Sequence, residues 1–211
     1  GTDHHAFKLT EDSVEEILSD IIFHYDEPFA DASAYPTMIV SKLARQHVTV
    51  TLSGDGADEL FLGYGMYNWA SRLANPIVQT FRKPVHWATQ YANLTYKRGG
   101  LLLDYPSLEH VRTHIFSQEQ YFHSEQDLKH LLLDEKFNFD RINEEIKTDK
   151  RKLNPKSKQS FWDINYYLKD DLLVKVDRAS MKYSLESRVP YLDHRVIEYA
   201  IDIDADLRYH K

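Results

Sequence analysis

The sequence contains no cysteine among its 211 residues. This absence excludes disulfides, thiol nucleophiles and cysteine-bound zinc, and it is typical of a cytoplasmic protein. No stretch approaches the roughly 20 apolar residues of a membrane span, so we expect a soluble protein with no membrane partner. The net charge is -7, whereas a surface that binds nucleic acid has an excess of Lys and Arg, so we expect no nucleic-acid partner. The basic run KRKLNPKSK (150–158) is therefore interpreted as a solvated linker.

Glycine is also scarce, yet four of the seven glycines fall in one stretch, VTVTLSGDGADELFLGYG (48–65). Glycine allows tight turns and a close approach of the backbone to a ligand. The acidic residues between these glycines could hold a metal ion or transfer a proton. The stretch therefore predicts either a ligand site or a tight turn.

A strand, a loop and a helix follow one another in this stretch. Apolar residues alternate with threonine over residues 48–52, which predicts a β-strand. ADELF (57–61) predicts the start of a helix, whose N-terminal amides would favour an anion. This order is typical of a parallel sheet, but residues 4–9 give the only other predicted strand, a weak one. We therefore expect the remaining strands to lie upstream of this sequence.

Three kinds of ligand loop compete for SGDGADE (53–59). A calcium loop needs oxygen ligands at alternate positions, and Ala57 interrupts them. A Walker phosphate loop needs Lys followed by Ser or Thr, which this loop lacks. A pyrophosphate loop with carboxylates and Mg²⁺ fits the residue types. A plain strand-to-helix turn with Asp58 as N-cap fits them as well.

Two helices are predicted near the N-terminus. The first would be capped by Thr10 and would place apolar residues from Val14 to Ile22 on one face. The second would be capped by Ser33 and would end near Arg45. If strands are missing from this sequence, the apolar face of the first helix would be exposed to solvent. We therefore expect residues 1–211 to have a tendency to self-associate.

The middle of the chain, residues 68–152, is predicted to be mostly helical, with breaks near residues 75–76, 99–100 and 106. His110 and His114 have the i,i+4 spacing of a metal pair, but a core or surface role is favoured. No function is predicted for this segment.

The last third carries an acidic residue on an apolar helix face. Asp171 falls beside Leu168 and Leu172 at helical spacing. A buried carboxylate needs a partner or a ligand, because burying it unpaired costs several kcal/mol. Asp193 is predicted to cap a further helix.

Three segments together resemble the synthetase domain of glutamine-hydrolysing asparagine synthetases: DEPFADASAYPT (26–37), LSGDGADELFLGYG (52–65) and DDLLVKVDRASMKYSLESRVPYLDHR (170–195). The resemblance implies an α/β fold, part of an ATP-pyrophosphatase (adenine nucleotide alpha hydrolase-like) domain that is predominantly helical here. Residues 1–211 would be part of one such domain, truncated at both ends. The family's SGGxDS segment and its glutaminase domain would lie outside the sequence.

The resemblance also implies a carbon–nitrogen ligase with glutamine as amide-nitrogen donor. ATP would adenylate the side-chain carboxylate of aspartate, and ammonia from glutamine would attack the resulting β-aspartyl-adenylate. ATP and Mg²⁺ are the implied cofactors, since Mg²⁺ would neutralise charge as pyrophosphate leaves. Without the glutaminase and nucleotide-binding segments, residues 1–211 alone are expected to be inactive.

The resemblance assigns binding roles to four residues of the loop. Ser53, Gly54 and Gly56 match the positions beside substrate and phosphates. Asp58 matches an acid associated with pyrophosphate and Mg²⁺, and it is the implied metal ligand.

Two further acids match catalytic positions. Asp55 stands where many members have Glu, an acid proposed to take a proton from attacking ammonia. Asp171 matches an active-site acid of the helical part, allowing for one extra residue. Leu62 stands where the family usually has Gly. These two departures favour one alternative, an amidotransferase acting on another carboxylate (sugar acid, peptide or β-amino acid). A non-catalytic module of the same fold is a second alternative.

Overall fold

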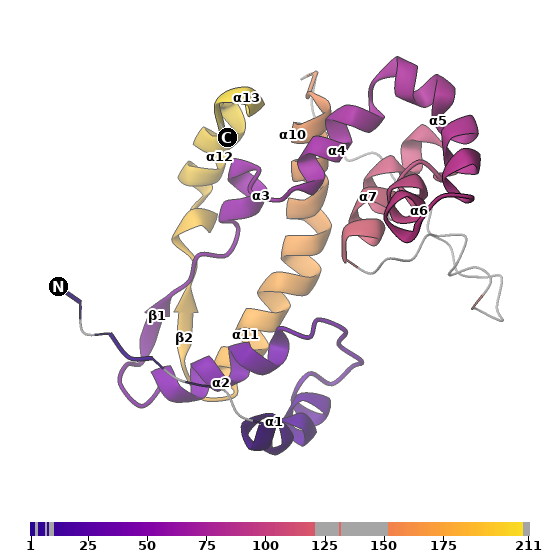
Figure 1. Ribbon diagram of the computed structural model, residues 1–211. Helices are drawn as coiled ribbons and strands as arrows, with labels where there is room; N and C mark the ends of the chain where they lie inside the picture. Colours follow the sequence, from indigo (N-terminus) through magenta and orange to yellow (C-terminus); the bar gives the residue numbers. More distant parts are fainter. Residues whose placement is uncertain (3, 7, 9–10, 121–130, 132–151, 209–211) are drawn as a thin grey trace. The chain divides into compact units, whose positions relative to one another are not determined.

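The parts of the protein that the structure describes consist mainly of helices, with one small sheet (Figure 1). The structure, a computed structural model, describes residues 1, 2, 4–6, 8, 11–120, 131 and 152–208. The chain divides into two compact units. Unit 1 comprises residues 1–56 and 167–197, and unit 2 comprises residues 57–166 and 198–211. Among the residues described, none of the helices has the length and apolar character needed to cross a membrane.

Unit 1 contains a two-stranded parallel sheet. Strand β1 (Val50–Leu52) pairs with β2 (Glu186–Arg188), and Thr51 lies opposite Ser187 (Figure 1). The pairing confirms β1 and the parallel arrangement that the sequence predicts. Strand β2 is not predicted, because Glu-Ser-Arg has neither an apolar alternation nor β-branched residues.

The weak strand predicted over residues 4–9 is wrong where the structure describes it. His4–Ala6 and Lys8 have no regular secondary structure. The ring of His5 stacks on that of His47, with 4.5 Å between centroids. A short run with partial alternation does not form a strand without a neighbour to supply its hydrogen bonds.

Helices α1 (Glu11–His24), α2 (Ala34–Ala44) and α11 (Leu173–Met181) provide most of the core of unit 1. Helix α2 contacts both α1 and α11. Both predicted N-terminal helices are confirmed, whereas the Thr10 cap lies outside the described residues. The core of buried side chains comprises Ile17, Ile21, Tyr25, Ala34, Met38, Ile39 and Ala179.

The apolar face of α1 is covered only in part. Ile17 and Ile21 are buried, whereas Leu18, Ile22 and Phe23 are 45%, 66% and 82% exposed. Exposed apolar side chains on one helix favour association. Self-association of the chain therefore stays a prediction.

Unit 2 is helical over its described residues. Its helices are α3 (Ala57–Phe61), α4 (Met66–Leu73), α5 (Pro76–Thr89), α6 (Leu94–Leu101), the 3₁₀ turn η1 (Leu108–His110), α7 (Val111–Gln120), α10 (Pro155–Asp163) and α13 (Ala205–Arg208). The π-helix η2 (Ile164–Leu172) and helix α12 (His194–Asp202) each contain a boundary between the units; η3 (Pro190–Leu192) belongs to unit 1.

Local signals explain several helix ends. The Asn75 side chain accepts a hydrogen bond from Ile77 N at 2.9 Å and Pro76 opens α5, which confirms the break predicted there. The break predicted near residues 99–100 is confirmed within one residue, because α6 ends at Leu101. A Cβ on Gly100 would lie 1.9 Å from the Thr89 hydroxyl, so this glycine also allows α6 to pack closely against α5.

The basic run 150–158 is not simply a linker. Asn154 caps α10 by accepting a hydrogen bond from Ser157 N at 2.8 Å, so the last four residues of the run are helical. His114 is buried and its Nε2 lies 3.0 Å from the Leu101 carbonyl oxygen. Burial lowers the pKa of His114, which fits the predicted core role.

Leu62 has a left-handed backbone, with φ of 60°, although its side chain is 3% exposed in the core of unit 2. We expect Leu62→Ala to lower the free energy of unfolding by about 2–4 kcal/mol, because burial is lost and the strain stays. Leu62→Gly should be about 1 kcal/mol more stable than Leu62→Ala, since glycine adopts this conformation freely. Urea denaturation of both variants measures the difference; an alanine variant as stable as the glycine variant would contradict it.

Candidate functional site

The loop after β1 is held by a few local hydrogen bonds. Ser53 N donates to the Arg188 carbonyl at 2.8 Å, which extends the β1–β2 pairing by one step. The Ser53 hydroxyl donates to Asp55 Oδ2. Gly56 has φ of 82°, and a Cβ there would lie 2.5 Å from Leu192 Cδ2. A side chain is thus excluded at Gly56 by both backbone conformation and packing.

A pocket of about 460 Å³ opens beside this loop, within unit 1. Its walls come from α2, the end of β1, α11 and β2. The lining residues are Ser33, Pro36, Thr37, Val40, Ser41, Ala44, Thr51, Leu52, Ser53, Asp55, Lys175, Val176, Ser180, Leu185 and Ser187. Of the site residues predicted from the sequence, Ser53 and Asp55 line this pocket.

Lys175, on α11, contributes a buried positive charge at this pocket. Its Nζ donates to Asp31 Oδ2 at 2.8 Å and to Ser33 Oγ at 2.7 Å. Burial would raise the pKa of Asp31, but the hydrogen bonds from Lys175 and Ser33 hold it below its usual value. Asp31 is therefore ionised at neutral pH and forms an ion pair with Lys175.

Asp171 occupies a different part of unit 1. It is half-buried on η2, next to the buried Leu172. Its charge acts on the Tyr25 hydroxyl: burial first, then Asp31 and Asp171, raise the pKa of Tyr25 to about 12. The inward direction predicted for this acid thus agrees with the structure. The helix carrying it is a π-helix, a form frequent at functional sites.

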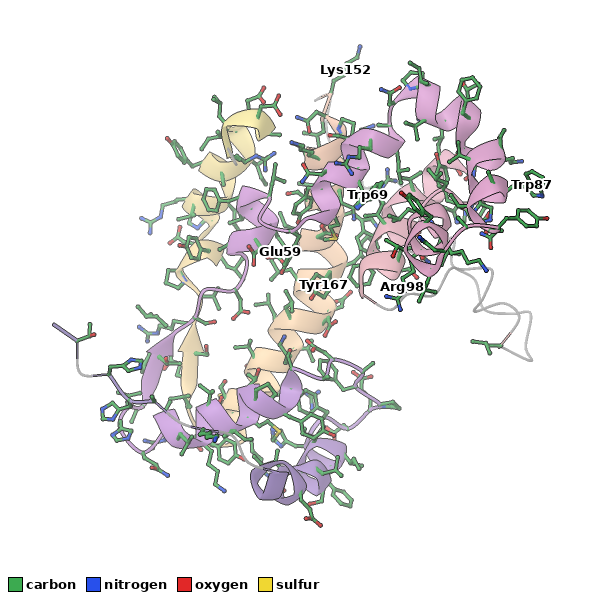
Figure 2. All side chains as sticks on the ribbon, in the orientation of Figure 1. Glu59, Trp69, Trp87, Arg98, Lys152 and Tyr167 are labelled. Atoms are coloured by element: carbon green, nitrogen blue, oxygen red, sulfur yellow. The ribbon has the colours of Figure 1, made fainter. Side chains whose placement is uncertain are left out.

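Asp58 belongs to unit 2, in the first turn of α3. A Cβ on Gly63 would lie 1.9 Å from Asp58 Oδ1, so Gly63 leaves room for this carboxylate. Asp58 is exposed, whereas Glu59 beside it is buried and accepts a hydrogen bond from the Tyr64 hydroxyl at 2.9 Å. Figure 2 labels Glu59 on α3. The Ser160 hydroxyl donates to the Glu59 carbonyl at 2.7 Å, which ties α3 to α10.

The carboxylates that the structure describes do not form a preformed metal cage. In the part of the chain that the structure describes, no group of three His, Cys, Asp or Glu residues could hold a metal ion. Asp58 supplies a single accessible carboxylate. This suits Mg²⁺, which proteins commonly bind through one or two carboxylates together with water and substrate phosphates.

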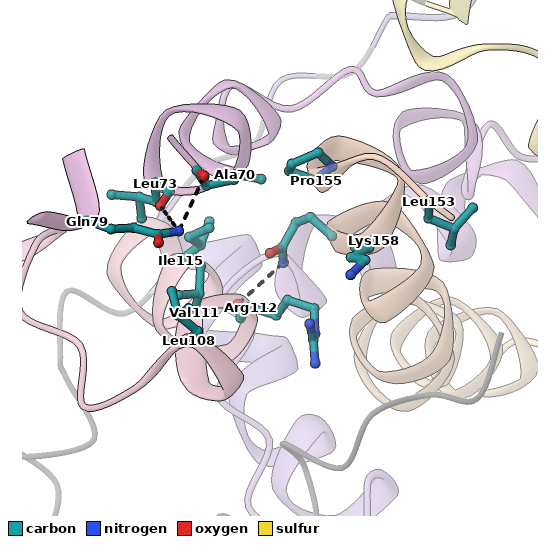
Figure 3. A pocket seen from close by; sticks show the side chains of 12 residues that line it. Ala70, Leu73, Gln79, Leu108, Val111, Arg112, Ile115, Leu153, Pro155 and Lys158 are labelled. Atoms are coloured by element: carbon teal, nitrogen blue, oxygen red, sulfur yellow. Dashed lines mark hydrogen bonds between the residues drawn. The ribbon is translucent and has the colours of Figure 1, made fainter. Parts of the chain in front are cut away.

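Unit 2 contains a second pocket, of about 230 Å³ (Figure 3). Apolar side chains such as Leu73 and Ile115 line it together with Arg112 and Lys158. Gln79 Nε2 donates to the carbonyl oxygens of Leu73 and Ala74 at its edge. The predicted site residues are not among the residues lining this pocket.

Comparison with known proteins identifies the family. A family model described as "Asparagine synthase" matches residues 1–211. The chain belongs to the asparagine synthase family. It is 32% identical over 204 residues to asparagine synthetase [glutamine-hydrolyzing] 1 of Bacillus subtilis, a match covering 93% of this chain and 32% of that protein. No significant match was found among solved structures.

Other family relatives give the same result. A putative asparagine synthetase [glutamine-hydrolyzing] of Mycobacterium tuberculosis is 30% identical over 97% of this chain and 32% of its own. A putative asparagine synthetase [glutamine-hydrolyzing] 2 of Methanocaldococcus jannaschii is 32% identical over 85% of this chain and 35% of its own. The chain thus spans about a third of the length of these relatives. The predicted family is confirmed.

Proposed function

We propose that residues 1–211 are part of one asparagine synthetase domain, of the ATP-pyrophosphatase type, in a glutamine-dependent carbon–nitrogen ligase. The parent protein would convert aspartate to asparagine through a β-aspartyl-adenylate, using ATP and ammonia derived from glutamine. The observation that carries this proposal is the pocket at the end of β1. There the matched loop residues Ser53 and Asp55 line one cavity together with Lys175.

Each site residue has a proposed role. Ser53 and Gly54 lie where the backbone would approach substrate and phosphates, and Gly56 gives the loop its turn. Asp55 would accept a proton from ammonia as the C–N bond forms. Ser53 donates to one carboxylate oxygen of Asp55, and the other oxygen, Oδ1, would be the proton acceptor.

The two remaining acids, Asp58 and Asp171, have separate proposed roles. Asp58 would hold Mg²⁺, which offsets the negative charge of the departing pyrophosphate. Asp171 is proposed as an active-site acid, and its half-buried position on η2 leaves the carboxylate partly accessible to a ligand.

An assay of the full-length protein tests the proposal. ATP, Mg²⁺, aspartate and ammonia are supplied, and AMP and asparagine are quantified together. Equal amounts of the two products would support the synthetase. ATP consumed only with another carboxylate would favour the amidotransferase alternative, which Asp55 and Leu62 motivate because the family usually has Glu and Gly there. No ATP consumption with any acceptor would favour a non-catalytic module.

Two glycines of the loop should respond differently to alanine. No atom lies within 4 Å of a Cβ on Gly54, so Gly54→Ala should leave stability unchanged yet lower activity about tenfold or more by displacing the phosphates. Gly56→Ala should lower the free energy of unfolding by about 1–3 kcal/mol, because of its positive φ and the contact with Leu192. Thermal unfolding and the product assay separate the two effects. Full activity of Gly54→Ala would contradict a ligand beside this backbone.

A further inference from the structure

Lys175 has hydrogen-bonding capacity beyond its two partners. A lysine ammonium group carries three N–H donors. Two of them are used, by Asp31 Oδ2 and by Ser33 Oγ. Both Lys175 and Ser33 line the 460 Å³ pocket, which places the ammonium group at the pocket wall. The third donor is available to a molecule in this pocket.

Both carboxylate oxygens of Asp31, in contrast, already accept hydrogen bonds within the protein. Its Oδ1 accepts from Ser33 N at 2.8 Å and from Ser33 Oγ at 2.7 Å, and its Oδ2 accepts from Lys175. Asp31 is not among the residues lining the pocket, so it binds Lys175 on the side away from the pocket. Lys175 is 8% exposed and its position is therefore fixed by this ion pair and by packing. A fixed, largely desolvated ammonium group binds an oxyanion more strongly than a mobile surface lysine does.

We propose that Lys175 binds an anionic oxygen group of the ligand in the unit 1 pocket, with Asp31 as its positioning residue. The charged side chains lining this pocket are Lys175 and Asp55. A ligand whose anionic group binds Lys175 would have its reacting group near Asp55. The anion is a carboxylate of the acceptor or a phosphate of the nucleotide. The inference rests on the proposed function in taking this pocket as the ligand site.

Anion binding to the full-length protein tests the proposal by calorimetry, with L-aspartate and inorganic pyrophosphate as separate probes. Lys175→Met leaves Asp31 buried without its cation and could unfold the protein. The double variant Asp31→Asn/Lys175→Met removes both charges and should restore the fold. Lys182→Met is the matched control, because Lys182 forms a comparable ion pair with Asp20, at 2.9 Å, in the same unit but away from the pocket lining.

We expect the double variant to bind one probe at least about tenfold more weakly than the wild type, while Lys182→Met binds as the wild type does. The probe that loses affinity identifies the anion as carboxylate or phosphate. A folded double variant that binds both probes like the wild type would overturn the proposal, and so would a wild type that binds neither. Lys175-dependent binding without asparagine formation by the wild type would support this inference and contradict the proposed function. If the double variant formed asparagine with unchanged KM values, the proposed function would be supported and this inference would be contradicted.

Discussion

Asp55→Asn should lower asparagine formation by about 10²–10⁴-fold while AMP is still released. The amide keeps the size of the side chain and can accept the hydrogen bond from Ser53, but it cannot take a proton from ammonia. Adenylation precedes this proton transfer, so the adenylate would form and then be lost to water. AMP and asparagine measured in the same reaction therefore give a ratio that a loss of folded protein would not change.

Two further variants sharpen this result. Asp55→Glu introduces the acid that many family members have at this position, and it should retain most of the activity. Asp170→Asn removes an exposed acid of the same unit, paired with Lys169 at 3.3 Å, and should leave both products unchanged. If Asp55→Asn made AMP and asparagine in equal amounts at the wild-type rate, Asp55 would not be the base.

The second large effect concerns stability and comes from a buried acid in unit 2. Asp163 is fully buried on α10 beside Tyr67 and Glu59. Burial raises the pKa of Asp163 from 3.8 to about 8, and the hydrogen bond from Gln159 Nε2, at 3.0 Å, offsets this only in part. The Asp163 carboxyl group is therefore protonated in the folded protein at neutral pH.

The sign of the pH dependence follows from proton binding. Between about pH 4 and 8 the folded state holds a proton on Asp163 that the unfolded chain has released. The contribution of this group to stability thus falls as pH rises, by at most about 1.4 kcal/mol for each pH unit. Asp163→Asn keeps a neutral polar group at this position and removes the proton. We expect the variant to lose less stability than the wild type between pH 5 and 8.

Urea denaturation at several pH values checks this prediction. The difference in unfolding free energy between Asp163→Asn and the wild type should change by a few kcal/mol in favour of the variant as pH rises. Asp206→Asn, at an exposed position of the same unit, should follow the wild-type curve. Parallel curves for Asp163→Asn and the wild type would show that the Asp163 carboxyl group does not titrate in this range.

Local patterns predicted the local structure well. Alternating apolar residues placed β1 and helical spacing placed α1, because neighbours in sequence determine these elements. Ser33 marked the start of α2, although its side chain makes no capping hydrogen bond there. Strand β2 could not be predicted, since its polar residues form a strand only by pairing with β1. The motifs also located the loop, but the reason for Gly56 became clear only from its contact with Leu192.

The charged groups of the site were the hardest to predict. Asp31 and Lys175 are 144 positions apart, and no spacing rule connects them. The structure nevertheless pairs the Lys175 ammonium group with the Asp31 carboxylate, at 2.8 Å. The buried Asp163 gave no signal either, because its burial depends on packing among α3, α4 and α10.

The division of the chain into two units affects how the protein folds during its synthesis. Unit 1 needs residues 1–56 and 167–197, and the two strands of its sheet come from these separate segments. At about 5–20 residues per second, the ribosome releases β2 on the order of ten seconds after β1. During that interval the α1–α2 pair lacks α11, and its apolar surface is open to other nascent chains. Unit 1 is therefore expected to depend on chaperones during synthesis, whereas helices α3 to α7 of unit 2 follow one another in the sequence and can pack as they emerge.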